Sequence, residues 1–392
     1  MTPEGGANHY NSLGVLPQAP ISTYRENGEE TTWPEGVYST DFYTDKLIEY
    51  IASNIKDEQP FFTYASYTSP HWPLQVDEKY WRKYEGKYDE GYETLQAKRL
   101  ESLKAAGMVS EEVVLPELNP RVKLWNELSP EEQKKEARKM EIYAGMVDNL
   151  DENIGRLIDY LKEVGAYENT LIIFLSDNGA AAEDFYYEEP FKKLLQSNFT
   201  DAYEQMGTPE SFISYGPQWA EAGTGPFRYF KTYMSEGGIS VPMIIRGPGI
   251  EDIGQIESAF ATVLDLAPTI YEFADAQYSK NSNGKELKPL LGKSIWPVLK
   301  AEKDQIHSKD YVFGMEHSGN AMIRKGDWKL LNYQRPFDRA NFALFNLKED
   351  PSEQIDLREE SPEKYEEMLS EWDLWSKKVG VLLPSPKSKK DL

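Results

Sequence analysis

A long amphipathic segment that leads into a short, wholly apolar run places the strongest constraint on the fold. From Pro130 to Val164 apolar side chains recur at helical spacing. Gly165 ends this pattern, and residues 171–175 (Leu-Ile-Ile-Phe-Leu) are predicted to form a strand buried on both faces. Helix, short loop and apolar strand in this order are typical of an α/β domain with a parallel sheet. The predicted helical stripe consists of Tyr143, Val147, Leu150, Ile154, Leu157 and Leu161.

Similar patterns flank this unit. Further strands are predicted at 61–67 and 241–245, and helices from about residue 40 and at 265–274. The Tyr-, Lys- and Glu-rich stretch 76–128 is expected to be a helical insertion over the surface, and the aperiodic residues 1–37 an extended loop.

The pattern changes near residue 305, after a polar segment at 277–288 that is expected to be a linker. Short strands at 311–316, 321–324, 328–332 and 343–347 precede a helix at 362–379, and the basic tail 384–390 is expected to be frayed. We therefore predict two units. Residues 1–290 would form an α/β domain, and residues 305–392 a small α+β domain with an antiparallel sheet.

Composition excludes several classes of function. A net charge of −23 argues against nucleic acid or an anionic membrane as the main partner. The longest purely aliphatic and aromatic run, 171–175, is far too short to span a bilayer. The chain has no cysteine, which removes zinc–thiolate sites, iron–sulfur clusters and cysteine nucleophiles.

The tetrapeptide Ser176-Asp177-Asn178-Gly179 directly follows the predicted strand 171–175. The carboxyl ends of strands line the ligand crevice of an open α/β sheet. Asp177 and Asn178 would offer adjacent oxygen ligands there for calcium or magnesium. The same residues are also common turn formers, and the tetrapeptide alone favours the turn.

Two further side chains could do chemistry. His71 lies between prolines in Ser69-Pro70-His71-Trp72-Pro73 and could act as a general acid or bind an anion, or be satisfied by backbone groups. Lys231 precedes the Gly-Gly turn at 237–238 and could present its ammonium group to an oxyanion, although most lysines are solvated. A structural role is favoured for His317. The acidic run Asp148, Asp151 and Glu152 is interpreted as a solvated helix face.

Taken in order, the motifs resemble the sulfatase family, specifically the bacterial arylsulfatase type of the alkaline-phosphatase-like superfamily. The resemblance covers residues 36–358. It rests on the segments 69–75 (SPHWPLQ), 143–157, 174–179 (FLSDNG), 231–244, 263–270 (VLDLAPTI), 291–294 (LGKS), 323–330 (IRKGDWKL) and 344–353. It implies a mostly parallel sheet with flanking helices.

The resemblance also implies roles for individual residues. Asp177 and Asn178 would be two ligands of the family's calcium ion, and Asn in place of His gives an all-oxygen site that favours calcium over zinc. His71 would face the sulfate and the leaving-group oxygen, and Lys231 would bind the sulfate. The expected substrate is a sulfate ester of a small molecule or glycan.

The chain departs from the family pattern where the nucleophile is expected. Sulfatases carry adjacent aspartates on the first strand and a Cys or Ser followed by x-Pro-x-Arg, whose first residue becomes formylglycine. The nearest candidate, at 240–244, has Ile244 in place of the required Arg. The resemblance therefore implies the C-terminal two-thirds of a sulfatase, with half of the calcium site and an α/β domain incomplete at its N-terminus.

Three hypotheses remain open on the sequence: a sulfuric ester hydrolase that is inactive in this form, a non-catalytic binding module, and a phosphonate or phosphate monoester hydrolase of the same superfamily. An incomplete sheet would leave an unpaired edge, which predicts association with a further polypeptide segment or with itself. The family implies a periplasmic or secreted location, which this N-terminus does not indicate.

Overall fold

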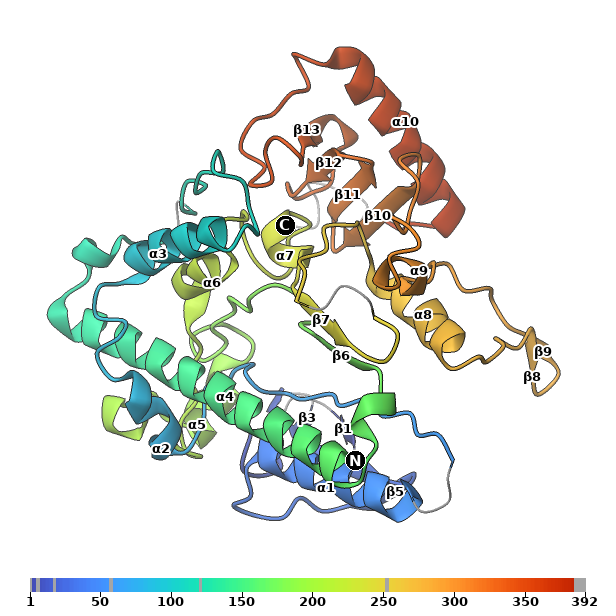
Figure 1. Ribbon diagram of the computed structural model, residues 1–392. Coiled ribbons are helices and arrows are strands. Elements are labelled where there is room, and N and C mark those ends of the chain that lie inside the picture. The colour runs from blue at the N-terminus through green and yellow to red at the C-terminus, as the bar shows by residue number, and fades with distance from the viewer. Residues whose placement is uncertain are drawn as a thin grey trace.

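The computed structural model describes residues 2–4, 8–16, 19–55, 59–119, 122–250 and 254–383. Figure 1 shows a long helix, α4, running beside α1 at one end of the molecule and a sheet covered by α10 at the other. The helices are α1 (Ser39–Asn54), α2 (Glu78–Trp81), α3 (Tyr92–Ala105), α4 (Pro130–Glu163), α5 (Lys192–Asn198), α6 (Gly216–Thr224), α7 (Glu236–Ile239), α8 (Leu266–Phe273), α9 (Trp296–Leu299) and α10 (Pro362–Val379).

The strands are short. They are β1 (Thr2–Glu4), β2 (Leu13–Leu16), β3 (Ala19–Ile21), β4 (Thr23–Glu26), β5 (Glu29–Thr31), β6 (Ile172–Leu175), β7 (Met243–Arg246), β8 (Asn281–Ser282), β9 (Lys285–Glu286), β10 (Val312–His317), β11 (Asn320–Lys325), β12 (Trp328–Asn332) and β13 (Ala343–Asn346).

Helix α4 begins and docks through polar groups. Its first turn is closed by a capping box, in which the Glu132 backbone N–H donates to the Ser129 hydroxyl and the Ser129 N–H donates to the Glu132 carboxylate. Asn149 and Asn153 are buried, and both donate to the same Asp41 carboxylate oxygen on α1, over 3.0 and 2.7 Å. The predicted apolar stripe is therefore only part of the buried face, and its member Val147 is exposed.

Strands β6 and β7 correct the prediction of a parallel sheet. They pair with each other in antiparallel register, with Ile172 opposite Arg246 and Leu175 opposite Met243. The prediction that 171–175 is buried on both faces is also wrong, because Phe174 and its cross-strand partner Ile244 are exposed. The local pattern identified both strands, but strand direction depends on a connection of almost seventy residues, which the pattern does not encode.

Three other predictions are corrected. Residues 61–67 form no strand. The first 37 residues include two small antiparallel units, β2–β3 and β1–β4–β5, instead of a continuous loop. The expected linker at 277–288 contains the hairpin β8–β9, at the right of Figure 1. The tail 384–390 lies outside the described residues.

The main core lies between α4, α6 and the segment that was expected to cover the surface. The helices predicted within 76–128 are present, but this segment also buries side chains against α4. Gly145 makes this approach possible, because a Cβ there would lie 2.7 Å from the Trp81 backbone nitrogen. The core residues from this segment are Val76, Tyr80, Trp81 and Tyr92.

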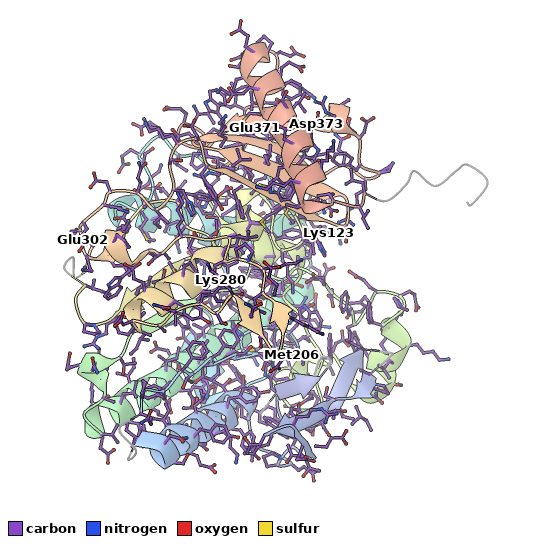
Figure 2. The ribbon with its side chains drawn as sticks, turned by 90° about the vertical axis from the view of Figure 1, so that its right-hand side faces the viewer. Lys123, Met206, Lys280, Glu302, Glu371 and Asp373 are labelled. Atoms are coloured by element: carbon purple, nitrogen blue, oxygen red, sulfur yellow. The ribbon has the colours of Figure 1, made fainter. Side chains whose placement is uncertain are left out.

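The C-terminal part is as predicted. Strands β10, β11, β12 and β13 form one antiparallel sheet in sequence order, and α10 packs on it over a separate apolar cluster. The Lys325 ammonium, at the end of β11, pairs with Glu371 on α10 over 2.7 Å, and Figure 2 shows Glu371 and Asp373 on that helix. Within the described ranges, every helix is too short or too polar to cross a membrane.

Candidate active site

The loop that carries His71 is fixed by buried polar side chains from distant parts of the chain. Gln75 is fully buried; its side-chain carbonyl accepts from the His9 backbone N–H over 3.0 Å, and its amide donates to the Ser211 carbonyl over 2.8 Å. The His9 ring lies between the Ser39 hydroxyl, at 2.7 Å, and the His71 carbonyl, at 3.1 Å. These bonds hold the backbone at His71 itself and at Gln75, four residues after it.

His71 and Lys231 meet although 160 residues separate them. The Lys231 Nζ lies 3.1 Å from the His71 Nε2, and both side chains are half-buried. The His71 Nδ1 lies 3.0 Å from the Trp72 carbonyl, which can only accept. Nδ1 therefore carries a proton, and Nε2 accepts from the lysine ammonium.

Burial lowers the pKa of His71, and the Lys231 charge lowers that pKa further. The Trp72 carbonyl and the charges of Glu183 and Asp177 act in the opposite direction. A bound anion at Lys231 would add negative charge beside the ring. Such an anion would therefore favour the protonated imidazole that an acid role requires.

Lys231 is held by a strained loop. Tyr229 and Thr232 have φ values of 60° and 81°, in the left-handed region that a β-branched residue such as Thr rarely adopts. The Lys231 backbone N–H donates to the Ala180 carbonyl over 3.0 Å, and the Thr232 carbonyl accepts from the Asn320 amide over 2.9 Å. The loop is therefore tied to the Asp177–Asn178 segment and to the C-terminal sheet.

The glycines of two motifs bring three segments together. The Gly179 N–H donates to the Gly238 carbonyl, and a Cβ on Gly179 would lie 1.9 Å from the Gly237 carbonyl oxygen. A Cβ on Gly237 would lie 2.1 Å from the Tyr229 carbonyl oxygen. Only glycine fits at these contacts, so Ser-Asp-Asn-Gly, the Gly-Gly turn and the lysine loop form one packed unit.

Asp177 and Asn178 lie at the end of β6, where the sequence placed them. The Asp177 side chain is exposed, and the Asn178 amide donates to the Gly179 carbonyl over 2.8 Å, which leaves its oxygen for another partner. Two oxygens fit part of a calcium site, which takes about six to eight. Within the described part of the chain, no group of three or more His, Cys, Asp or Glu side chains could hold a metal. Asp177 and Asn178 would therefore hold a metal ion only together with other ligands.

A buried charge cluster anchors the Gly-Gly turn to the C-terminal sheet. The fully buried Lys329 ammonium lies 2.7 Å from Glu236 on α7 and 2.7 Å from Glu353. Glu353 also accepts from the Glu236 backbone N–H. Burial, together with the Glu236 charge, raises the pKa of Glu353 to about 7, whereas Lys329 lowers the pKa of Glu236 below its usual value. The motifs at 323–330 and 344–353 thus act by fixing α7.

The motif at 263–270 is structural. The buried Asp265 carboxylate accepts from the backbone N–H groups of Thr262 and Lys293, both over 2.7 Å, and from the His307 ring over 2.9 Å. Gly292 lies so close that a Cβ there would be 2.0 Å from the Leu264 carbonyl oxygen. These contacts join the 263–270 and 291–294 motifs to each other, away from His71.

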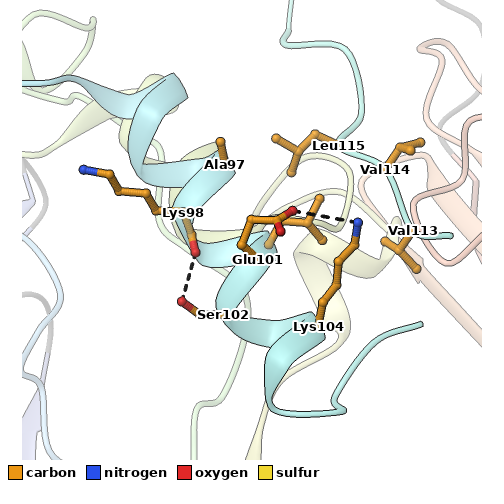
Figure 3. Close-up of a pocket in the computed structure, with 9 residues that line it drawn as sticks. Ala97, Lys98, Glu101, Ser102, Lys104, Val113, Val114 and Leu115 are labelled. Carbon is orange, nitrogen blue, oxygen red and sulfur yellow. Dashed lines mark hydrogen bonds and ion pairs between the residues drawn. The ribbon is translucent and has the colours of Figure 1, made fainter. Parts of the chain in front are cut away.

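The remaining predicted acidic and histidine positions lie outside the site. Asp148 pairs with Lys83 over 2.6 Å, Asp151 and Glu152 are exposed, and His317 is exposed at the end of β10. Figure 3 shows a surface pocket between α3 and residues 113–115. The residues that line this pocket include neither His71 nor Lys231.

Sequence reasoning missed three residues around the site. His9 and Gln75 position the His71 loop through contacts more than sixty residues apart, for which no local pattern exists. Glu183 lies near enough for its charge to affect the pKa of His71, and its buried carboxylate oxygen Oε2 has no hydrogen-bond partner among the described residues. Gln75 lies within the motif 69–75, and this position was the one sign in the sequence that it could belong to the site.

Comparison with known proteins decides the family. The family model described as Sulfatase matches residues 13–276, and the model described as N-sulphoglucosamine sulphohydrolase, C-terminal, matches residues 225–374. The chain belongs to the sulfatase family. An uncharacterized sulfatase of Schizosaccharomyces pombe is 34% identical over 395 residues, a match that covers 96% of this chain and 70% of that protein.

An arylsulfatase of Klebsiella aerogenes is 37% identical over 303 residues, which covers 76% of this chain and 64% of that protein. The sulfatase chain therefore spans about two-thirds of these relatives. Among solved structures, Ps i-CgsB is similar with a TM-score of 0.60 and 23% identity, over 95% of this chain and 64% of that one. This similarity shows that the two chains share a fold.

Proposed function

We propose that this sulfatase chain provides the sulfate-binding half of a sulfuric ester hydrolase, for sulfate esters of small molecules or glycans. The contact between the Lys231 Nζ and the His71 Nε2 carries the proposal, because it places a positively charged side chain next to a titratable ring. Lys231 would bind an equatorial sulfate oxygen, and His71 would give the proton on Nε2 to the leaving-group oxygen.

Asp177 and the Asn178 side-chain oxygen would supply two ligands to a calcium ion. When bound, that ion would stabilise negative charge on the sulfate oxygens. In this role Asn178 is oriented by its hydrogen bond to the Gly179 carbonyl. The packed glycines at 179 and 237 would keep these oxygens in place relative to Lys231.

The 392-residue chain should bind sulfate but not turn over sulfate esters by itself, because its sequence lacks the formylglycine motif. Titration calorimetry with inorganic sulfate would measure binding. Lys231→Met should weaken it about 10-fold or more, the loss expected for one charge-assisted hydrogen bond. Lys162→Met, on an exposed face of α4, is the matched control. Hydrolysis of an aryl sulfate by the purified chain, or sulfate binding unchanged in Lys231→Met, would contradict the proposal.

The two alternatives make different predictions. A non-catalytic binding module would bind sulfate in the same way, but a complete protein that contains this chain would show no turnover. A phosphonate or phosphate monoester hydrolase would prefer phosphonate or phosphate esters to sulfate esters when the complete protein is tested against both.

A further inference from the structure

The segment that follows Ser-Asp-Asn-Gly connects the two loops of the candidate active site. The Ala180 carbonyl accepts from the Lys231 backbone N–H over 3.0 Å. Five residues later, the Phe185 ring contacts the ring of Trp72, the residue next to the predicted acid, with 5.0 Å between the ring centroids. Segment 180–185 therefore runs from the lysine loop to the loop that carries the predicted acid, and its middle residues lie between them.

Glu183, in the middle of this segment, has a carboxylate without a partner. Its side chain is half-buried, and within the described structure its enclosed oxygen Oε2 has no hydrogen-bond partner. The Lys231 ammonium does not pair with this carboxylate but donates to the His71 Nε2 over 3.1 Å. Burial has the largest effect on the pKa values of His71 and Tyr215, and the Glu183 charge raises both values. The carboxylate therefore lies close to the predicted acid.

An unpaired carboxylate beside a sulfate-binding lysine is unfavourable for two reasons. A buried polar oxygen without a hydrogen bond costs free energy. A carboxylate also repels the sulfate group that Lys231 would bind. A carboxylate accepts hydrogen bonds and does not donate them, and the same is true of the sulfate oxygens. A donor that satisfies Glu183 in the bound state must therefore come from the other part of the ester, the leaving group.

We propose that Glu183 selects sulfate esters whose leaving group carries a hydroxyl or ammonium group, by accepting a hydrogen bond from that group while Lys231 holds the sulfate. The inference rests on the proposed function and names the residue that chooses among its substrates. An ammonium group is preferred to a hydroxyl, because it also neutralises the carboxylate charge. A simple aryl sulfate, whose ring carries no donor, gains nothing from Glu183.

The test uses three esters of nearly equal size that differ in one group: ethyl sulfate, 2-hydroxyethyl sulfate and 2-aminoethyl sulfate. Titration calorimetry at low salt, with the 392-residue chain, measures their affinities. Ethyl sulfate should bind most weakly and 2-aminoethyl sulfate most tightly, with about 10-fold between them, the gain expected for one charge-assisted hydrogen bond. The affinity for 2-hydroxyethyl sulfate should lie between these two.

Two variants separate the two donors. Glu183→Gln keeps an acceptor without a charge, so it should lose the preference for the ammonium group and keep that for the hydroxyl. Glu183→Met has neither acceptor nor charge and should bind all three esters about equally. Both variants should bind ethyl sulfate at least as tightly as the unaltered chain does, because the repulsion is removed. Glu188→Gln, which removes an exposed carboxylate five residues further on, is the matched control and should keep the full preference.

A purely structural role for Glu183 would give a different result. Glu183→Met would then weaken the binding of all three esters by the same factor and lower the unfolding temperature, and this outcome overturns the proposal. An order of affinities that is unchanged in Glu183→Met overturns it too, as does the absence of any preference in the unaltered chain.

Lys231→Met distinguishes this inference from the proposed function. If ethyl sulfate does not bind, or binds equally well to Lys231→Met, the proposed function fails and the role of Glu183 fails with it. If ethyl sulfate binding depends on Lys231 but the order of the three esters does not depend on Glu183, the proposed function stands and only the role of Glu183 fails.

Discussion

His9 should make the stability of the protein depend on pH. Its ring is almost completely buried between Ser39 and the His71 carbonyl. Burial lowers its pKa from 6.5 to about 4, although the hydrogen bond to the His71 carbonyl partly opposes the shift. The folded state thus disfavours the protonated ring, whereas the unfolded chain takes up a proton near pH 6.5. The stabilisation is complete above pH 6.5 and is lost as the pH falls towards 4.

The magnitude follows from the shift. Lowering the pKa from 6.5 to about 4 corresponds to about 3 kcal/mol over the whole range, of which about 1 kcal/mol is lost between pH 8 and pH 5.5. That interval stays above the sequence pI of about 4.7, so the protein keeps a negative charge throughout. The neighbouring His71, whose pKa is also lowered, contributes a loss of the same sign.

The contribution of His9 is isolated by comparing variants. Urea unfolding followed by tryptophan fluorescence gives the free energy of unfolding at pH 8 and pH 5.5 for the unaltered chain and for His9→Gln. The variant should lose about 1 kcal/mol less over this interval. His317→Gln, which removes an exposed histidine, controls for the loss of a histidine as such. Equal pH dependence in the unaltered chain and His9→Gln would refute the reasoning from burial.

Two further stability predictions concern packing. Lys329→Met leaves the buried carboxylates Glu236 and Glu353 uncompensated and should cost about 3–5 kcal/mol in urea unfolding at pH 8, less below pH 7, where Glu353 is protonated. Its control Lys325→Met, at a partly exposed pair, should cost less than about 1 kcal/mol, and equal losses would contradict the burial argument. Gly145→Ala should cost about 1–3 kcal/mol because of the Trp81 backbone, whereas Gly155→Ala on the same helix, with open space at its Cβ, should be neutral or stabilising by up to about 1 kcal/mol. If Gly145→Ala unfolded at a higher temperature than Gly155→Ala, α4 would have to shift away from Trp81 at little cost, which would contradict this prediction.

The sequence predicts well where structure is decided locally. The C-terminal strands and α10 were placed within a residue or two, because alternation and helical spacing are properties of short windows. Residues 61–67 have the composition of a strand, but a strand also needs a neighbour, and the structure provides none. The antiparallel pairing of β6 with β7 was missed for the same reason, since it joins residues about seventy positions apart.

The site shows the same division between local and distant information. His71, Lys231, Asp177 and Asn178 were predicted by resemblance, and the structure brings the first two into contact. The residues that position them, such as His9 and Asn320, act across long sequence separations and carry no local signature. The glycines at 179 and 237 were visible as motifs, but only their contacts explain why no other residue fits.

The two halves of the proposed site differ in how firmly they are held. Buried hydrogen bonds hold the His71 loop in place. The Lys231 loop is held by hydrogen bonds to Ala180 and Asn320 and by the close packing of the glycines at 179 and 237. Because these contacts are already complete, the proposed binding of sulfate would require little reorganisation of either side chain. The Asp177 side chain is exposed, so it is held less firmly than His71 and Lys231. Sulfate binding at Lys231 should therefore be separable from metal binding at Asp177 and Asn178.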